Sequence, residues 1–169
     1  MKQSLLLFTI ISLCAVTSCN STRNVSYKSS EYKKEKKTAY KSSNKQADSV
    51  LREAKKYLGT PYKYGGTTKS GMDCSGLVIN AYNAAGIQMP RISRDQANEG
   101  KEIKLKDVRE GDLVFFNTSG SRISHVGIVE DVKNGEVFFI HSSSSKGVIV
   151  SSIEETYWSK RFVKAVRVL

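Results

Sequence analysis

Residues 125–141 read HVGIVEDVKNGEVFFIH, and this stretch determines how the C-terminal half of the chain folds. It contains two β-rich segments, His125–Asp131 and Val137–His141, with Asn134-Gly135 between them. Asn-Gly between two such segments is a strong signal for a β-hairpin, because both residues tolerate the positive φ angles of a type I′ turn. The stretch therefore predicts an antiparallel hairpin with a tight turn.

The hairpin brings together the two histidines of the chain. Counting outward from the turn places residue 125 opposite about residue 144 and residue 128 opposite residue 141, and a bulge would shift this pairing slightly. His125 shares its strand face with Gly127 and Val129, because side chains alternate along a strand. We expect His141, on the neighbouring strand, to lie close enough to orient the imidazole of His125.

The sequence on either side of the hairpin predicts the rest of the domain. Asp48 is placed to cap a helix whose apolar residues recur at helical spacing over residues 50–58, and Gly59 ends it. A second helix should begin at Asp73-Cys74 and end by Gly86. Three further β-rich runs are Leu113–Asn117, Val148–Ser152 and Phe162–Val168. Helices followed by an antiparallel sheet indicate an α+β fold.

The first 18 residues have the parts of an export signal: Lys2, an apolar run from Leu5 to Leu13 and the small pair Thr17-Ser18. Cys19 follows directly, and residues 16–19 (VTSC) resemble the lipobox of bacterial lipoproteins, in which the cysteine becomes the lipidated first residue. The resemblance implies a membrane-anchored protein of the cell envelope with its domain outside the cytoplasm. Ordinary secretion with an incidental cysteine is the alternative.

Residues 19–47 have the composition of a lipidated, flexible, basic tether, which leaves residues 48–169 as the folded domain. Residues 20–47 hold eight Lys and Arg but two Glu, whereas residues 48–169 hold 18 Lys and Arg against 14 Asp and Glu. The net charge of +11 therefore belongs mostly to the tether, which argues against nucleic acid as the partner. The tether would lie along anionic headgroups or wall polymer, or act as a solvated spacer.

Cys74 is the single thiol that the exported domain would keep, because Cys14 leaves with the signal peptide and Cys19 takes the lipid. A disulfide within the chain is then impossible, and a lone thiol in an oxidising compartment is either buried or used. At the start of a helix, backbone N–H groups and the helix dipole stabilise a thiolate. With His125 and His141 as available bases, the residues predict a cysteine nucleophile activated by histidine.

A zinc site built from Cys74, His125 and His141 is the competing interpretation. Structural zinc sites usually contain a close ligand pair such as Cys-x-x-Cys or His-x-x-His, and this sequence has neither. We therefore expect no metal and no other cofactor.

Five sequence blocks, in order along residues 48–165, resemble the NlpC family of papain-like cell-wall cysteine peptidases. They are YKYGG at 62–66, GMDCSGLV at 71–78, PRISRDQ at 90–96, GDLVFF at 111–116 and SHVGI at 124–128. The resemblance implies a papain-like fold, with N-terminal helices packed on a five- to six-stranded antiparallel sheet. It also implies a murein endopeptidase that hydrolyses peptidoglycan stem peptides between D-glutamate and the following diamino acid.

The resemblance also assigns residues to roles. It implies that Cys74 is the nucleophile, His125 the general base, His141 the orienting residue and Tyr64 an active-site tyrosine. Tyr64 is our candidate for the second oxyanion donor, beside the backbone N–H of Cys74. The residues implied to line the substrate side of the groove are Asp73, Ser75, Arg91 and Ser93.

Several alternatives stay open at this point. Asp73 and Ser75 can simply cap the helix, or Asp73 can bind the free α-amine of a stem peptide, while Arg91 can bind a substrate carboxylate or stay solvated. An amidase or acyltransferase would use the same Cys-His pair, and a catalytically silent wall-binding module would keep the fold alone. We expect a monomer.

Overall fold

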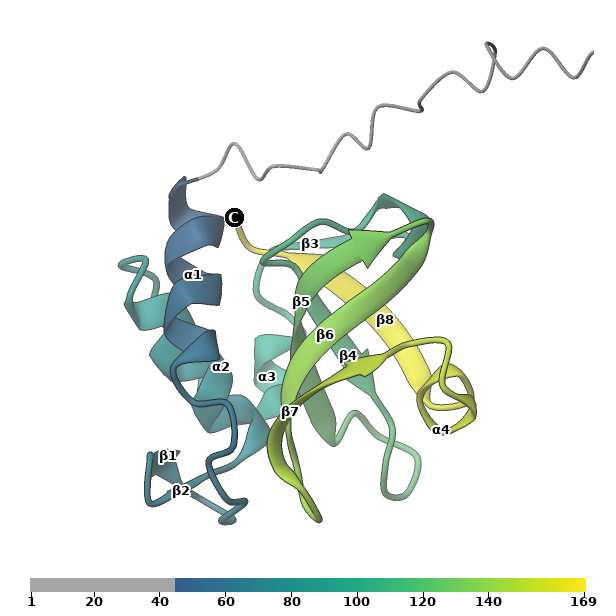
Figure 1. The fold of residues 1–169 in the computed structure, drawn as a ribbon. Coiled ribbons are helices and arrows are strands. Elements are labelled where there is room, and N and C mark those ends of the chain that lie inside the picture. Colours follow the sequence, from purple (N-terminus) through teal and green to yellow (C-terminus); the bar gives the residue numbers. More distant parts are fainter. Residues whose placement is uncertain (1–44) are drawn as a thin grey trace, which may run out of the picture. The chain divides into compact units, whose positions relative to one another are not determined.

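The computed structural model describes residues 45–169 (Figure 1). The predicted signal peptide, the lipobox with Cys19 and the tether up to residue 44 lie outside the described residues and stay predictions. Over residues 45–169, every helix is too short or too polar to cross a membrane.

Two helices, α1 (Lys45–Lys55) and α2 (Cys74–Asn83), form a layer on one side of a sheet, as Figure 1 shows. The shorter helical segments are α3 (Ser93–Gln96), α4 (Thr156–Ser159) and the 3₁₀ turn η1 (Leu105–Asp107). α2 begins at the residue that the sequence predicts. α1 begins at Lys45, so the prediction that Asp48 caps it is wrong. The cause is tertiary: buried Ala47 packs against Gly111 and carries the helix one turn further.

The sheet has six antiparallel strands in the order β3-β8-β4-β5-β6-β7, which confirms the α+β fold. Its strands are β3 (Lys101–Ile103), β4 (Leu113–Phe116), β5 (His125–Lys133), β6 (Glu136–Ser143), β7 (Gly147–Ser152) and β8 (Phe162–Arg167). A separate small ribbon pairs β1 (Thr67–Thr68) with β2 (Gly71–Met72). The sequence predicts all of the six-stranded sheet except β3, a three-residue edge strand without apolar alternation.

The hairpin forms at the predicted turn, where Asn134 and Gly135 have φ angles of 54° and 85°. The register agrees with the count near the turn and differs beyond it, because a bulge lies between Val129 and Asp131 of β5. Residue 128 therefore pairs with Ile140 and not with residue 141. A bulge adds one residue to one strand, which accounts for this register shift of one residue.

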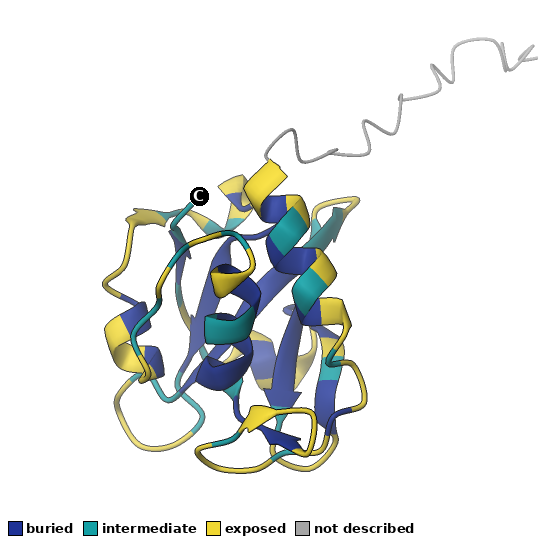
Figure 2. Cartoon of the chain, turned by 90° about the vertical axis from the view of Figure 1, so that its left-hand side faces the viewer, coloured by how far each residue is buried: buried dark blue, intermediate teal, exposed yellow. Residues whose placement is uncertain are grey.

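The sheet separates two apolar cores, so its central strands are buried on both faces. In β4, Leu113 and Phe115 face α1 and α2, whereas Val114 and Phe116 face a second core that Trp158 of α4 closes. Alternation along a strand sends neighbouring side chains to opposite faces. The dark blue of the central strands in Figure 2 agrees with this burial.

Gly127 of β5 leaves room for an aromatic ring that supports the histidines. A Cβ atom at this position would lie 2.4 Å from Cδ2 of Phe139, a distance that real Cβ atoms do not show. The Phe139 ring in turn stacks on His141, with centroids 4.8 Å apart. The absence of a side chain at Gly127 therefore allows the close packing beneath His141.

Candidate active site

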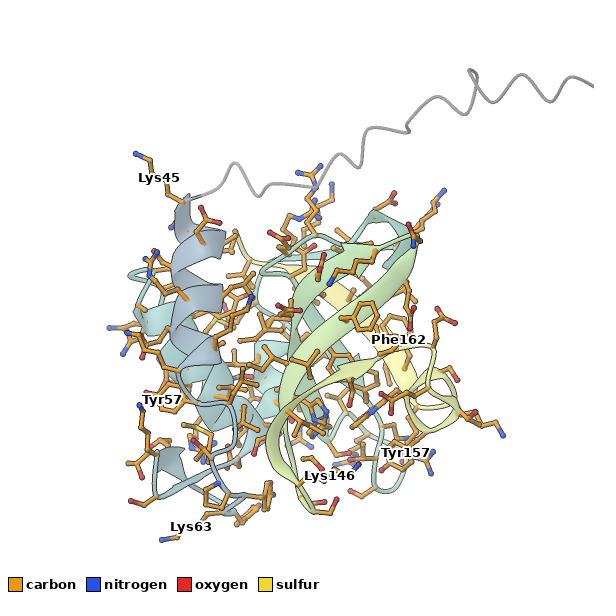
Figure 3. All side chains as sticks on the ribbon, in the orientation of Figure 1. Lys45, Tyr57, Lys63, Lys146, Tyr157 and Phe162 are labelled. Atoms are coloured by element: carbon orange, nitrogen blue, oxygen red, sulfur yellow. The ribbon has the colours of Figure 1, made fainter. Side chains whose placement is uncertain are left out.

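An open cleft of about 940 Å³ lies at one end of the sheet and collects the predicted site residues. Its walls come from the loop after α1, the start of α2, the α3 segment and strands β5 to β7. Figure 3 shows two of its rim residues, Lys146 and Tyr157, at the same end of the molecule. All eight residues that the sequence assigns to catalysis or substrate binding line it: Tyr64, Asp73, Cys74, Ser75, Arg91, Ser93, His125 and His141.

Cys74 is the first residue of α2 and the only cysteine within the described part of the chain. The helix begins there because Asp73 has an extended backbone and its carboxylate accepts the N–H of Gly76 at 2.7 Å. A second contact fixes this helix start against the sheet: the Ser142 hydroxyl donates to the Met72 carbonyl at 2.8 Å. The thiol is therefore held at a rigid junction between the helix layer and β6.

Asp73 is buried and its carboxylate is saturated with donors. Oδ1 accepts from Gly76 N–H, from Arg91 at 3.1 Å and from the Ser75 hydroxyl at 3.3 Å. Oδ2 accepts from Gly65 N–H at 2.9 Å and from Arg91 at 2.6 Å. A carboxylate offers about four lone-pair directions. The capping alternative is thus what the structure shows, and a substrate amine would have to displace an existing donor.

Arg91 bridges this network and still faces the cleft. Its Nη1 also donates to the Ser75 hydroxyl at 2.8 Å, and its side chain is 41% exposed. A guanidinium has five N–H donors, and the contacts with Asp73 and Ser75 use three of them. Of the predicted substrate residues, Arg91 is therefore the one with charge and donors free to meet a ligand.

His125 and His141 form a hydrogen-bonded pair, as the hairpin predicts. Nε2 of His125 lies 3.0 Å from Nδ1 of His141, and Nε2 of His141 lies 3.2 Å from the hydroxyl oxygen of Ser151. The Trp158 ring stacks on His125 with centroids 5.2 Å apart and meets His141 edge-on at 4.7 Å. Because its Nε2 is engaged, His125 has only Nδ1 left to exchange a proton with another group.

Burial keeps all three groups neutral. It lowers the pKa of His125, and burial together with the neighbouring His125 lowers the pKa of His141. Burial also raises the pKa of the Cys74 thiol to about 11, while the backbone of Val126 and the helix start at Ser75 oppose this rise. The helix start does stabilise the thiolate, as the sequence suggests, but desolvation has the larger effect.

Alkylation of Cys74 should therefore follow a high titration midpoint. Iodoacetamide reacts with the thiolate, so the alkylation rate should rise about tenfold per pH unit from pH 7 and reach half of its maximum near pH 11. The rate is measured by mass spectrometry of the peptide that contains Cys74. In guanidinium chloride, the alkylation rate of the same peptide should reach half of its maximum near pH 8.5, about the ordinary pKa of cysteine. A fast plateau already present at pH 6 would contradict a neutral thiol.

Both Tyr62 and Tyr64 line the cleft, and Tyr62 is the less exposed of the two. Tyr64 is 89% exposed at the rim of the cleft. Tyr62 is half-buried, its backbone pairs with Met72, and burial and the nearby Cys74 raise its pKa. The sequence could not distinguish the two tyrosines, because both lie in a stretch that it predicts only as a loop.

Sequence reasoning also missed two residues that touch the histidine pair. Ser151 and Trp158 are both buried against it. A serine in a β-rich run and a tryptophan in an unpredicted helical turn give no local signal of such a role. In residues 45–169, no group of three or more histidine, cysteine, aspartate and glutamate side chains is arranged to hold a metal ion.

Comparison with known proteins gives a consistent family match. The profile of the NlpC/P60 family matches residues 59–167. The "Probable endopeptidase NlpC" of Escherichia coli K12 is 44% identical over 112 residues, covering 65% of this chain and 70% of that protein. The "Murein DD-endopeptidase MepS/Murein LD-carboxypeptidase" of the same strain is 40% identical over 114 residues, covering 67% of this chain and 58% of that protein.

Two further matches bear on the bond and on the fold. The "Bifunctional muramidase/DL-endopeptidase CwlT" of Bacillus subtilis is 39% identical over 124 residues, covering 72% of this chain but 36% of that protein. A crystal structure of an NlpC/P60 family protein from Bacillus cereus superposes with a TM-score of 0.66 at 29% identity, covering 73% of this chain and 40% of that one. This chain thus spans well under two thirds of several of the proteins that it matches.

Proposed function

Because this chain belongs to the NlpC/P60 family, a family of cysteine peptidases, we propose that it is a peptidoglycan endopeptidase that uses Cys74, His125 and His141. The observation that carries the proposal is that one cleft is lined both by the thiol at the start of α2 and by a hydrogen-bonded histidine pair. A nucleophile, a base and a residue that orients the base are the three parts that thiol peptidases need.

In the proposed mechanism, Nδ1 of His125 accepts the proton of Cys74 as the sulfur attacks the scissile carbonyl carbon. The C–N bond then breaks, and His125 returns the proton to the leaving amine. Water, deprotonated by the same Nδ1, hydrolyses the thioester and frees Cys74. The neutral state of both groups before reaction suits this transfer, because an imidazole must be unprotonated to act as the base.

The tetrahedral intermediate needs donors for its oxyanion. We place the backbone N–H of Cys74 in this role, because it lies at the start of α2 where helix N–H groups are unpaired. We replace Tyr64 by Tyr62 as the second donor, since Tyr62 is the tyrosine whose pKa responds to Cys74 and whose backbone pairs with Met72.

The charges around the cleft suit a stem peptide with free carboxylates. The cleft is lined by three basic residues, Arg91, Arg94 and Lys146, and by two acidic residues, Asp73 and Glu155. Arg91 forms an ion pair with Asp73, so the lining is basic overall. For the scissile bond we keep the D-glutamyl–diamino acid bond. CwlT, named a DL-endopeptidase, supports this bond, whereas MepS is named for DD and LD activities. Lipidation at Cys19, which would hold the domain outside the cytoplasm, belongs to the same proposal.

Defined muropeptides test the proposed bond directly. The purified protein is incubated with monomeric disaccharide tri- and tetrapeptides and with a crosslinked tetrapeptide dimer, and the products are identified by mass spectrometry. We expect cleavage of the monomers to fragments that end in L-Ala-D-Glu. Conversion of the dimer to intact monomers would assign DD activity, and loss of the terminal D-Ala alone would assign LD activity. Transfer of an acyl group to an added amine, without hydrolysis, would overturn the peptidase proposal.

A further inference from the structure

The hydrogen-bond chain through the active site ends at a side chain with no assigned role. It runs from His125 Nε2 to His141 Nδ1 at 3.0 Å, and from His141 Nε2 to Ser151 Oγ at 3.2 Å. Ser151 lies on β7 diagonally across from His141, whose direct partner on that strand is Ile149. His141 is fully buried and Ser151 is 6% exposed. Both ring nitrogens of the orienting histidine are thus engaged by neighbours.

The direction of the protons along this chain determines whether His125 can act as a base. For Nδ1 of His125 to accept the thiol proton, its own ring proton must be on Nε2. That N–H donates to Nδ1 of His141, so the proton of His141 must be on its Nε2. The last N–H then needs an acceptor, and Ser151 Oγ is the atom within reach. The opposite direction puts a proton on Nδ1 of His125 and blocks the base.

We propose that Ser151 is a positioning residue that fixes the base-competent tautomers of both histidines by accepting the Nε2–H of His141. The inference rests on the proposed peptidase function of this site. A serine hydroxyl can accept this bond while its own hydrogen turns elsewhere, because the hydroxyl rotates freely. Without the hydroxyl, Nε2–H of His141 would be a buried donor with no acceptor, which is costly. The opposite tautomers, with the proton on Nδ1 of both histidines, then become populated, and His125 cannot act as the base.

Two variants of equal shape test the role of the hydroxyl. Ser151→Thr keeps an oxygen on Cβ, whereas Ser151→Val replaces that oxygen with a methyl group. We expect kcat/KM on the muropeptide substrate to stay within a few-fold of wild type for Ser151→Thr. It should fall about 10- to 100-fold for Ser151→Val, by analogy with the loss when the hydrogen-bond partner of a metal-bound histidine is removed. If the extra methyl group of Thr and Val disturbs folding, Ser151→Ala compared with wild type tests the hydroxyl without it.

Nitrogen NMR of ¹⁵N-histidine-labelled protein reads the tautomers without any assay of activity. The chain contains only two histidines, so the spectrum at neutral pH reports this pair alone. We expect Nε2–H on both rings in wild type and in Ser151→Thr, and a new Nδ1–H form in Ser151→Val or Ser151→Ala. If the tautomers of these variants match wild type, the inference is wrong, whatever happens to kcat/KM. If wild type cleaves no muropeptide while the tautomers shift, the proposed function fails and the tautomer assignment stands.

Discussion

Replacement of Cys74 by serine should abolish peptidase activity and leave the fold intact. Serine matches the shape of cysteine, but its hydroxyl is a far poorer nucleophile at neutral pH, so kcat/KM should fall by about three orders of magnitude or more. His125→Ala should cause a comparable loss, because Nδ1 of His125 is the proposed proton acceptor. His141→Ala should cost less, since this ring orients the base and does not itself move the thiol proton.

The measurement is kcat/KM on a purified muropeptide, together with the melting temperature of each variant. Cys74→Ser and wild type should melt within a degree or two, so any loss of activity reports chemistry. Residual activity of Cys74→Ser above about one per cent would rule out Cys74 as the nucleophile. Near-normal turnover of His125→Ala would show that another residue is the base. The hydrogen bonds from His125 to His141 and on to Ser151 would then have no role in catalysis.

Replacement of Asp73 by alanine should cause the largest loss of stability. The carboxylate caps α2, accepts Gly65 N–H and Gly76 N–H, and pairs with Arg91. Removing it deletes the cap and leaves two backbone donors without their acceptor, so unfolding should become easier by about 2–4 kcal/mol. Thermal unfolding measures this loss. The matched control is Arg91→Met, which removes the guanidinium bonds to Asp73 and Ser75 but leaves the helix cap and both backbone hydrogen bonds in place, so it should cost less than Asp73→Ala.

Activity of the same variants on two substrates distinguishes a cap from an amine-binding group. A free stem peptide has a protonated L-Ala amine, whereas the muramic-acid-linked peptide does not. Because the carboxylate is already filled by its own neighbours, Asp73→Asn should lower kcat/KM on both substrates by similar factors. A selective loss on the free peptide, with an unchanged melting temperature, would show that Asp73 binds the amine after all.

The sequence predicts those parts of the site that depend on local patterns. The Asn134-Gly135 turn brings His125 and His141 together, and Asp73 marks the start of the helix that carries Cys74. The features that the sequence could not predict depend on contacts between distant segments. The earlier start of α1 follows from packing against Gly111, and the choice of Tyr62 over Tyr64 follows from a backbone pairing with Met72.

The family resemblance and the residue chemistry both indicate a thiol with a histidine base, because a lone cysteine at a helix start is well placed to act as a nucleophile. Neither could show that the Asp73 carboxylate is saturated, since this depends on how Arg91 and Gly65 approach it in space. Desolvation of Cys74 is likewise a property of the assembled cleft and not of the helix start alone.

The contact of the Ser142 hydroxyl with the Met72 carbonyl has a consequence for when the protein becomes active. The thiol belongs to the helix layer, and both imidazoles belong to the sheet, so neither half contains a working site. A chain whose helix layer has not yet docked on the sheet has these halves apart. Such a chain lacks the assembled cleft, so the hydrolysis that we propose requires the helix layer to be docked on the completed sheet.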